Sequence, residues 1–340
     1  MSDIRRNLDK EFAFRRDRAL WEAERRKKEI VDKIPEIGAI DSQITLTGLK
    51  FARGIVSEDA SSMDSVSLIE RINQLKKKKE ELLLAANYPI DYLEPKFTCN
   101  ICEDRGYIND EKGAYVPCLC YQKLYLQRLY KFSNILDDGK TGFSFFNEHY
   151  FSDKVNSKKY KSDVSPRENI LTIKNQCLKF IDNFKEQNTK NMYFFGPTGT
   201  GKTFLAKSCG LELIKKGYTV LYLSATTLFS IIHRYRINLA SDDANIESAY
   251  KNLITSNLLI LDDLGTEPGS DARYAELLTL IELRKNQSSV TPTKTIISSN
   301  LDIKRLFQQY NERIASRIVG EFDIFQFFGD DIRIIRTMME

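Results

Sequence analysis

A glycine-rich segment of eight residues constrains this sequence more than any other feature. It matches the pattern G-x-x-x-x-G-K-[ST], and its members are Gly196, Pro197, Thr198, Gly199, Thr200, Gly201, Lys202 and Thr203. A hydrophobic run at 192–195 precedes it, and a helical stretch at 202–216 follows it. Glycines let a backbone curl so that successive N–H groups point at phosphate oxygens, and the positive end of the next helix adds to the attraction. The segment therefore predicts a strand, a phosphate-binding loop and a helix in succession.

The last two residues of this loop indicate what it holds. A lysine at this place reaches the β- and γ-phosphates of a nucleotide, and the hydroxyl that follows it binds Mg²⁺. We assign these roles to Lys202 and Thr203, and we expect ATP or ADP with Mg²⁺ as cofactors. A chance match has odds of about one in a hundred from composition alone, and the flanking strand and helix lower those odds further.

A phosphate loop needs an acid from a neighbouring strand to hold the metal. Residues 257–263 supply one, because four apolar residues there run into Asp262 and Asp263. Asp262 is the expected Mg²⁺ ligand, directly or through water, and Asp263 is the expected general base that polarises the attacking water. Asn300 ends the next apolar run at the same edge of the sheet, where it can bond the water or the γ-phosphate. The plainer alternative is a strand that merely ends in an Asp-Asp turn.

Short β-branched or aromatic runs recur through the second half of the chain, separated by helical stretches. They cover 192–195, 219–224, 258–261, 295–298 and 324–328, and a helix is expected at 168–184 before the first of them. Strands that alternate with helices form parallel sheets whose two faces are both covered. We therefore predict an α/β domain over residues 169–340, with a five-stranded parallel sheet and flanking helices.

The chain before this domain divides into three parts. Residues 1–92 are polar and helical in pattern, most simply an antiparallel hairpin with solvated outer faces. A helix pair that binds a partner or itself is the alternative, and the two are compatible. A cysteine-bearing module at 93–135 follows. Residues 136–168, mixed in character and ending in a Lys/Ser-rich stretch, are the expected linker that leads into the α/β domain.

Four of the six cysteines lie close together in the sequence, as Cys99-x-x-Cys102 and Cys118-x-Cys120. Four thiolates complete the tetrahedral shell of a structural Zn²⁺ ion, with no open position for catalysis. The module is small, so metal binding would supply much of its folding free energy. The two other cysteines, Cys177 and Cys209, lie on expected helices and are interpreted as buried small hydrophobic residues.

The composition of the chain indicates its cellular location. Residues 1–30 are rich in charge and lack the apolar core of a signal peptide. No apolar run approaches the roughly 20 residues of a membrane helix. We therefore expect a cytoplasmic protein without a membrane partner. The net charge of +4 permits a local basic surface but does not by itself indicate nucleic-acid binding.

Three phrases of the α/β domain resemble one family of proteins. They are the segments at 261–265 (LDDLG), 297–301 (ISSNL) and 311–317 (NERIASR), which together with the phosphate loop resemble the AAA+ ATPases of the DnaC/DnaI/IstB group. The resemblance covers about residues 140–340. It implies an ATPase with a truncated lid that self-associates through its AAA+ domain.

Three functions follow from this resemblance. The first is a replicative helicase loader, which engages a DnaB-type hexameric helicase through its N-terminal domain and places it on single-stranded DNA. The cysteine module favours this reading, because loaders of the DnaI type resemble that arrangement. The second is a transposition helper of the IstB kind. The third is a clamp or adaptor that binds nucleotide and hardly turns it over.

The resemblance also assigns two arginines. Arg317 matches the arginine finger that reaches the ATP of a neighbouring subunit, with Arg313 as the second candidate, and the plainer reading of both is a surface arginine. Arg333 lies where a sensor-2 arginine is expected. Only about a dozen residues follow the last strand, too few for the usual helical lid, and this departure weakens the assignment of Arg333.

Proteins of the initiator and loader group carry an extra helix before the Asp-Asp strand, here within 225–256. Basic and aromatic residues alternate in it, and such a set can contact a single-stranded backbone and stack on bases. The alternative is an amphipathic helix that covers the sheet. The residues concerned are Phe229, His233, Arg234, Tyr235 and Arg236.

Overall fold

The computed structural model describes residues 2–56, 62–135, 139–237, 243–266 and 271–339. Its contacts divide the chain into two units, one of residues 6–122 and one of residues 123–340 together with the first five residues. This division falls inside the region 93–135 that the sequence suggests as one module. Among the described residues no helix is both long and apolar enough to cross a membrane.

Three helices open the chain where the sequence suggested a two-helix hairpin. They are α1 (Ser2–Lys33), α2 (Pro35–Val56) and α3 (Ser62–Ala85). Pro35 stands at the first position of α2, where a missing N–H costs nothing, so the chain turns there and α2 packs against α3. Ile30, Ile37 and Leu83 form a small buried core between them.

The four clustered cysteines lie in the rest of this unit. A 3-10 turn, η1 (Ile90–Leu93), leads to the antiparallel hairpin of β1 (Tyr107–Asn109) and β2 (Tyr115–Pro117), and α4 (Leu119–Ser133) follows. The buried face of α1 reaches this region, because the Phe12 ring packs 5.3 Å from that of Tyr121. The Tyr121 hydroxyl donates to Asp9 at 2.8 Å.

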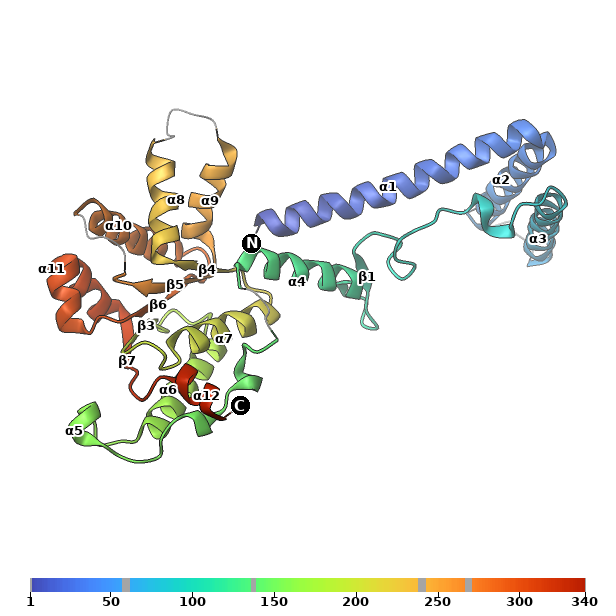
Figure 1. Cartoon of the computed structure of the whole chain (residues 1–340). Coiled ribbons are helices and arrows are strands. Elements are labelled where there is room, and N and C mark those ends of the chain that lie inside the picture. Colours follow the sequence, from blue (N-terminus) through green and yellow to red (C-terminus); the bar gives the residue numbers. More distant parts are fainter. Residues whose placement is uncertain (1, 57–61, 136–138, 238–242, 267–270, 340) are drawn as a thin grey trace. The chain divides into compact units, whose positions relative to one another are not determined.

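A five-stranded parallel sheet forms the centre of the second unit, as predicted (Figure 1). Its strand order is β4-β5-β6-β3-β7, so β6 separates the strand of the phosphate loop from that of the two acids. The strands are β3 (Asn191–Phe195), β4 (Val220–Ser224), β5 (Leu258–Leu264), β6 (Lys294–Ser299) and β7 (Phe322–Gln326). β5 continues three residues beyond the predicted run, and therefore includes Asp262 and Asp263.

Helices cover both faces of this sheet. α7 (Lys202–Lys215) packs on one face beside α6 (Pro166–Asp182). The other face carries α8 (Ala225–Ile237), α9 (Ala244–Thr255), α10 (Asp271–Gln287) and α11 (Ile303–Glu321), whose apolar residues share a buried core with alternate residues of β3 to β6. The period of two along a strand explains this division, since successive side chains point to opposite faces.

Four short elements complete the second unit, and most of them matter for the site. They are η2 (Phe143–Phe145), η3 (Glu148–Tyr150), α5 (Ser157–Tyr160) and the C-terminal α12 (Ile332–Met339). α12 and η3 pack together although they lie far apart in sequence. The α6 helix starts at Pro166, where the Ser165 hydroxyl accepts the Glu168 N–H at 3.2 Å and caps the helix.

Candidate nucleotide-binding site

The phosphate loop joins β3 to α7 in a conformation that depends on its glycines. Gly196, Gly199 and Gly201 have φ of +145°, +78° and +96°, values that side-chain-bearing residues rarely adopt. A Cβ on Gly196 would collide with the Phe327 carbonyl, and one on Gly199 would collide with the Asp331 carboxylate. The glycines therefore serve both the curl of the loop and its close contact with the C-terminal segment.

The side chain of Lys202 folds back into the phosphate loop. Its ammonium donates to the carbonyls of Gly196 at 2.7 Å and Pro197 at 2.8 Å, and to Asn300 Oδ1 at 3.0 Å. Burial lowers the pKa of Lys202 to about 8, and the carboxylates of Asp263 and Asp262 oppose that shift only in part. A phosphate group beside this ammonium would stabilise its charged form.

Asp262 and Thr203, the two expected Mg²⁺ ligands, are hydrogen-bonded to each other. Thr203 Oγ1 lies 3.1 Å from Asp262 Oδ1. Parallel pairing of β4 with β5 brings the ends of these strands level, with Ser224 opposite Asp262. The Asp262 side chain is only 3% exposed, yet hydroxyls surround it: Tyr222 Oη donates to Oδ2 at 2.6 Å and the Ser298 hydroxyl donates to Oδ1.

Asp263 turns away from the sheet while Asp262 turns into it. The φ angle of Asp263 is +56°, in the left-handed region, which aspartate tolerates better than most residues. The pairing of β5 with β6 also shifts register between Leu261 and Leu264. The Asp263 carboxylate consequently faces a cavity. Burial raises the pKa of Asp263, the nearby Asp262 carboxylate raises it further, and Lys202 lowers it in part.

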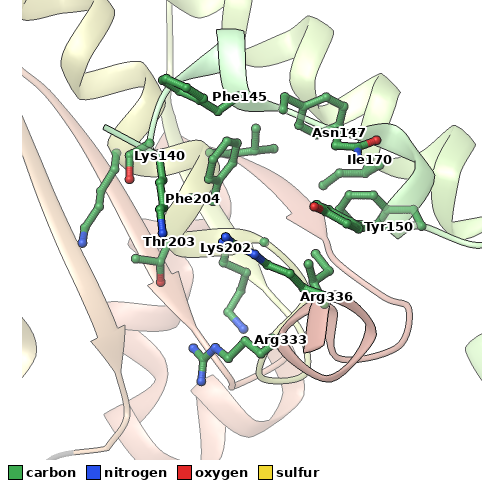
Figure 2. Close-up of a pocket in the computed structure, with 18 of the residues that line it drawn as sticks. Lys140, Phe145, Asn147, Tyr150, Ile170, Lys202, Thr203, Phe204, Arg333 and Arg336 are labelled. Carbon is green, nitrogen blue, oxygen red and sulfur yellow. The ribbon is translucent and has the colours of Figure 1, made fainter. Parts of the chain in front are cut away.

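A cavity of about 540 Å³ lies against the phosphate loop (Figure 2). Aromatic and aliphatic side chains from Phe145, Phe146, Ile170 and Phe204 form one part of its wall. Cationic side chains form another part of the wall. The Asp263 carboxylate and the Asn300 amide also line the cavity. The cations are Lys140, Lys202, Lys207, Arg333 and Arg336. An apolar region beside a cluster of cations suits a base next to a polyphosphate.

Sequence reasoning missed one wall of this cavity. Residues 139–141, 145–147 and 150–151, expected to belong to a linker, line it. The side chain of Phe151 is buried, and its ring lies 6.0 Å from that of Phe146. The aromatic cluster at 143–146 was the available signal, since a linker has no need of several phenylalanines.

The C-terminal segment closes the opposite side of the loop. The Phe327 N–H donates to the Phe195 carbonyl at 2.7 Å, and the Ile332 N–H donates to the Gly199 carbonyl at 2.9 Å. α12 follows with eight residues and places Arg333 and Arg336 in the cavity wall. Arg333 is therefore near the phosphate loop, as its predicted role requires.

Arg317 is not among the residues that line the cavity. It lies on α11 and donates to Glu282 at 3.0 Å and to Glu321 at 3.1 Å. Glu321 also pairs with Lys285 at 2.8 Å. Arg313, on the same helix, is exposed. Neither arginine lines the nucleotide cavity of its own chain.

The segment predicted to contact single-stranded DNA forms two helices, α8 and α9. Phe229 is buried in the core, so the amphipathic alternative is correct for this residue. The Tyr235 ring stacks on Tyr250 at 3.9 Å, and Arg236 pairs with Glu276 at 2.7 Å. Tyr235 and Arg236 thus already have partners within the chain, whereas His233 and Arg234 are exposed.

The four clustered cysteines converge within the first unit. All four Sγ atoms lie within 4.8 Å of one another. The Cys99–Cys118 pair is 3.9 Å apart and the Cys102–Cys120 pair 3.5 Å, close to the separation of about 3.8 Å that Zn–S bonds of about 2.3 Å give in a tetrahedron. The donor set therefore fits Zn²⁺. Buried Asp104 fixes the backbone at Cys99, because its carboxylate accepts the N–H groups of Thr98 and Cys99.

Together, the sheet order, the phosphate loop and the two acids define a P-loop nucleotide-binding domain. Residues 159–334 match the family of IstB-like ATP-binding proteins, and the chain belongs to that family. The unit of residues 6–122 lies outside the matched range.

Individual relatives come from two settings. A putative ATP-binding protein of insertion sequence IS232 from Bacillus thuringiensis is 28% identical over 167 residues, which cover 47% of this chain and 62% of that protein. The replicative helicase loader DnaC of Escherichia coli is 23% identical over 159 residues, which cover 47% and 60%. The chain thus spans less than two thirds of either relative. A solved DnaC helicase loader is 22% identical, with a TM-score of 0.40 over 54% of this chain and 100% of that one.

Proposed function

We propose that this protein is an ATPase that loads a DnaB-type hexameric helicase onto single-stranded DNA. The observation that carries this proposal is the unit of residues 6–122, which lies outside the family match and contains a four-cysteine cluster. A protein that needed only ATP-driven contacts with DNA would not require such a unit. We assign it to the helicase, and we assign self-association to the AAA+ domain. A loader acts in the cytoplasm, which is the location we propose.

In the proposed hydrolysis, the backbone N–H groups of the phosphate loop and the Lys202 ammonium bind the β- and γ-phosphates. Thr203 and Asp262 would hold Mg²⁺, which would supply positive charge beside these phosphates. Asp263 accepts the proton of the attacking water, and its raised pKa makes it a better base at neutral pH. Asn300 orients that water, and Arg333 contacts the γ-phosphate.

Arg317 completes the site of a neighbouring subunit in this proposal. Arg317 does not line the cavity of its own chain, which supports an action in trans, and its two carboxylate partners must release it first. Exposed ion pairs of this kind contribute little to stability, so contact with a neighbour's polyphosphate can replace them. Hydrolysis then depends on assembly, which lets ATP switch the contacts with helicase and DNA.

We assign Zn²⁺ to the four clustered cysteines, with a structural role. The convergence of the sulfurs from two separate segments supports this, because four free thiols have little reason to gather at van der Waals distance. The β1–β2 hairpin and the start of α4 depend on this cluster for their arrangement. Loss of the metal would therefore disturb the helicase-binding unit and leave the AAA+ domain folded.

A pull-down of the full chain with the replicative helicase of the same cell tests the loader function. We expect capture by the wild type and loss of capture in a Cys99→Ser, Cys102→Ser variant, which breaks the cluster. Cys177→Ala is the matched control, since this buried cysteine lies in the other unit. If the wild type does not retain the helicase with zinc and ATP present, the loader assignment is wrong.

A transposition helper is the second candidate, favoured by the relatives that belong to insertion sequences. The two candidates differ in what stimulates hydrolysis. A helper should respond to a transposase and duplex DNA, whereas a loader should respond to the helicase. An Asp263→Asn variant should lose activity in either case. Equal background rates in wild type and variant would leave a nucleotide-binding adaptor.

A further inference from the structure

Three hydroxyl groups from three different elements converge on the buried Asp262 carboxylate. Thr203 comes from the start of α7, Tyr222 from β4 and Ser298 from β6. The Tyr222 and Thr203 hydroxyls lie 2.6 and 3.1 Å from different oxygens of the carboxylate. Only Thr203 belongs to the phosphate loop, so the other two need an explanation of their own.

Tyr222 is held in place from both sides. Its strand pairs with β5, with Tyr222 opposite Ile260, so that its side chain shares the α7 face with Asp262. On the outer side the Lys207 ammonium lies 4.6 Å from the ring centroid, within the range of a cation–π interaction. Lys207 also lines the nucleotide cavity. The hydroxyl therefore approaches Asp262 in one fixed direction.

Ser298 connects the two acids. Its hydroxyl donates to Asp262 Oδ1 and accepts the Asp263 N–H at 3.2 Å. The residue is 0% exposed, and its backbone is fixed opposite Phe194 in the parallel pairing with β3. A change at this hydroxyl would thus reach both Asp262 and the strained backbone of Asp263.

We propose that Tyr222 and Ser298 are positioning residues for Mg²⁺. With one donor on each carboxylate oxygen, they fix the plane of Asp262 so that it faces the metal together with Thr203. Groups that orient a ligand in this way typically change metal affinity by 10–100-fold when removed. The inference rests on the proposed Mg²⁺–nucleotide role of this site, and it is independent of which partner the ATPase serves.

A purely structural role is the competing explanation. A buried carboxylate needs hydrogen bonds merely to offset the loss of water, and the two hydroxyls could do no more than that. The two explanations differ in one measurable respect. A structural role predicts lower fold stability and weaker nucleotide binding in general, whereas a positioning role predicts a loss confined to the contribution of the metal.

The test compares nucleotide affinity with and without metal in the full chain. The dissociation constant of a fluorescent ADP analogue is measured in EDTA and in excess Mg²⁺, and the ratio gives the enhancement by the metal. For Tyr222→Phe, which removes one oxygen, we expect an enhancement about tenfold lower than in the wild type and an unchanged EDTA value. Ser298→Ala should behave alike. Tyr125→Phe is the matched control, because its hydroxyl bonds the Gly217 carbonyl at 3.1 Å, outside the cavity wall.

A second readout does not depend on the nucleotide's fluorescence. Electron paramagnetic resonance of free Mn²⁺, titrated with protein and a non-hydrolysable ATP analogue, should show weaker metal binding in Tyr222→Phe than in Tyr125→Phe. The proposal is overturned if the metal enhancement is equal in variant and wild type, if the wild type shows none, or if the EDTA affinity falls by the same factor. A failed helicase pull-down leaves this test untouched, since neither assay contains helicase or DNA.

Discussion

The low pKa of Lys202 predicts that nucleotide affinity falls as the pH rises above about 8. Burial lowers the pKa of this ammonium to about 8 in the nucleotide-free chain. A bound polyphosphate favours the charged form, so it raises that pKa and its binding takes up a proton. The nucleotide therefore binds with its full affinity well below pH 8, where Lys202 is charged before binding. The affinity declines as the pH rises through the pKa of Lys202 in the nucleotide-free chain.

The pKa of about 8 for Lys202 also sets how steeply nucleotide affinity falls with pH. Each pH unit above a pKa of about 8 should weaken binding roughly tenfold, or about 1.4 kcal/mol, until the pKa of the bound state is reached. Between pH 7 and pH 9 we therefore expect the dissociation constant of ADP to rise about tenfold. The nucleotide itself does not titrate in this window, because the second pKa of a phosphate monoester is about 6.

Fluorescence titrations from pH 7 to pH 9 give the affinity profile. Calorimetry in buffers of different ionisation enthalpy then measures the proton taken up on binding, which should approach one near pH 9. Lys202→Arg is the matched control, since a guanidinium stays charged throughout and its profile should be flat at any absolute affinity. A wild-type affinity that is constant from pH 7 to pH 9, without proton uptake, would refute the reasoning.

Three further predictions concern separate parts of the chain. Gly199→Ala should weaken ATP binding at least tenfold, because the new Cβ meets a carboxylate and the left-handed backbone costs about 1–2 kcal/mol; Gly113→Ala, at nearly the same φ but in open space, is the control for the backbone alone. Arg317→Ala should spare ATP binding and reduce hydrolysis by about 10³ or more in assembled protein, so weaker binding by an isolated subunit would contradict a role in trans. The purified chain should contain one zinc per molecule by elemental analysis, and Cys102→Ser should lose it; equal zinc content in both would contradict the assigned cluster.

Local patterns sufficed to predict the sheet and the phosphate loop. Each strand is a short apolar run, and the two acids follow one of these runs directly, so the sequence alone indicated which side chains meet at one edge of the sheet. The resemblance at 311–317 added Arg317, which no pattern of hydrophobicity could distinguish from other exposed arginines. That assignment and the zinc site stay predictions.

Other contacts of the site depend on strand pairing and helix packing, and no local sequence pattern predicts them. Tyr222 lies in the middle of a strand, and its contact with Asp262 exists only because β4 pairs with β5 in one register. Phe145 and Phe146 line the cavity, and the Phe146 ring packs against Phe204 of α7, at a separation in sequence that periodicity does not cover. For α8 the sequence left two interpretations open, a nucleic-acid contact and a helix that covers the sheet, and packing places Phe229 in the core.

Most residues of the cavity wall lie within 139–151, 198–207 and 332–336, and this has a consequence for synthesis. A nascent chain on the ribosome can form β3 and the phosphate loop long before α12 has been translated. The hydrogen bond from Ile332 to Gly199 and the arginines of α12 become available only when the last of these segments has left the exit tunnel. ATP therefore meets a complete site only after residues 332–336 have been made and have packed against the phosphate loop.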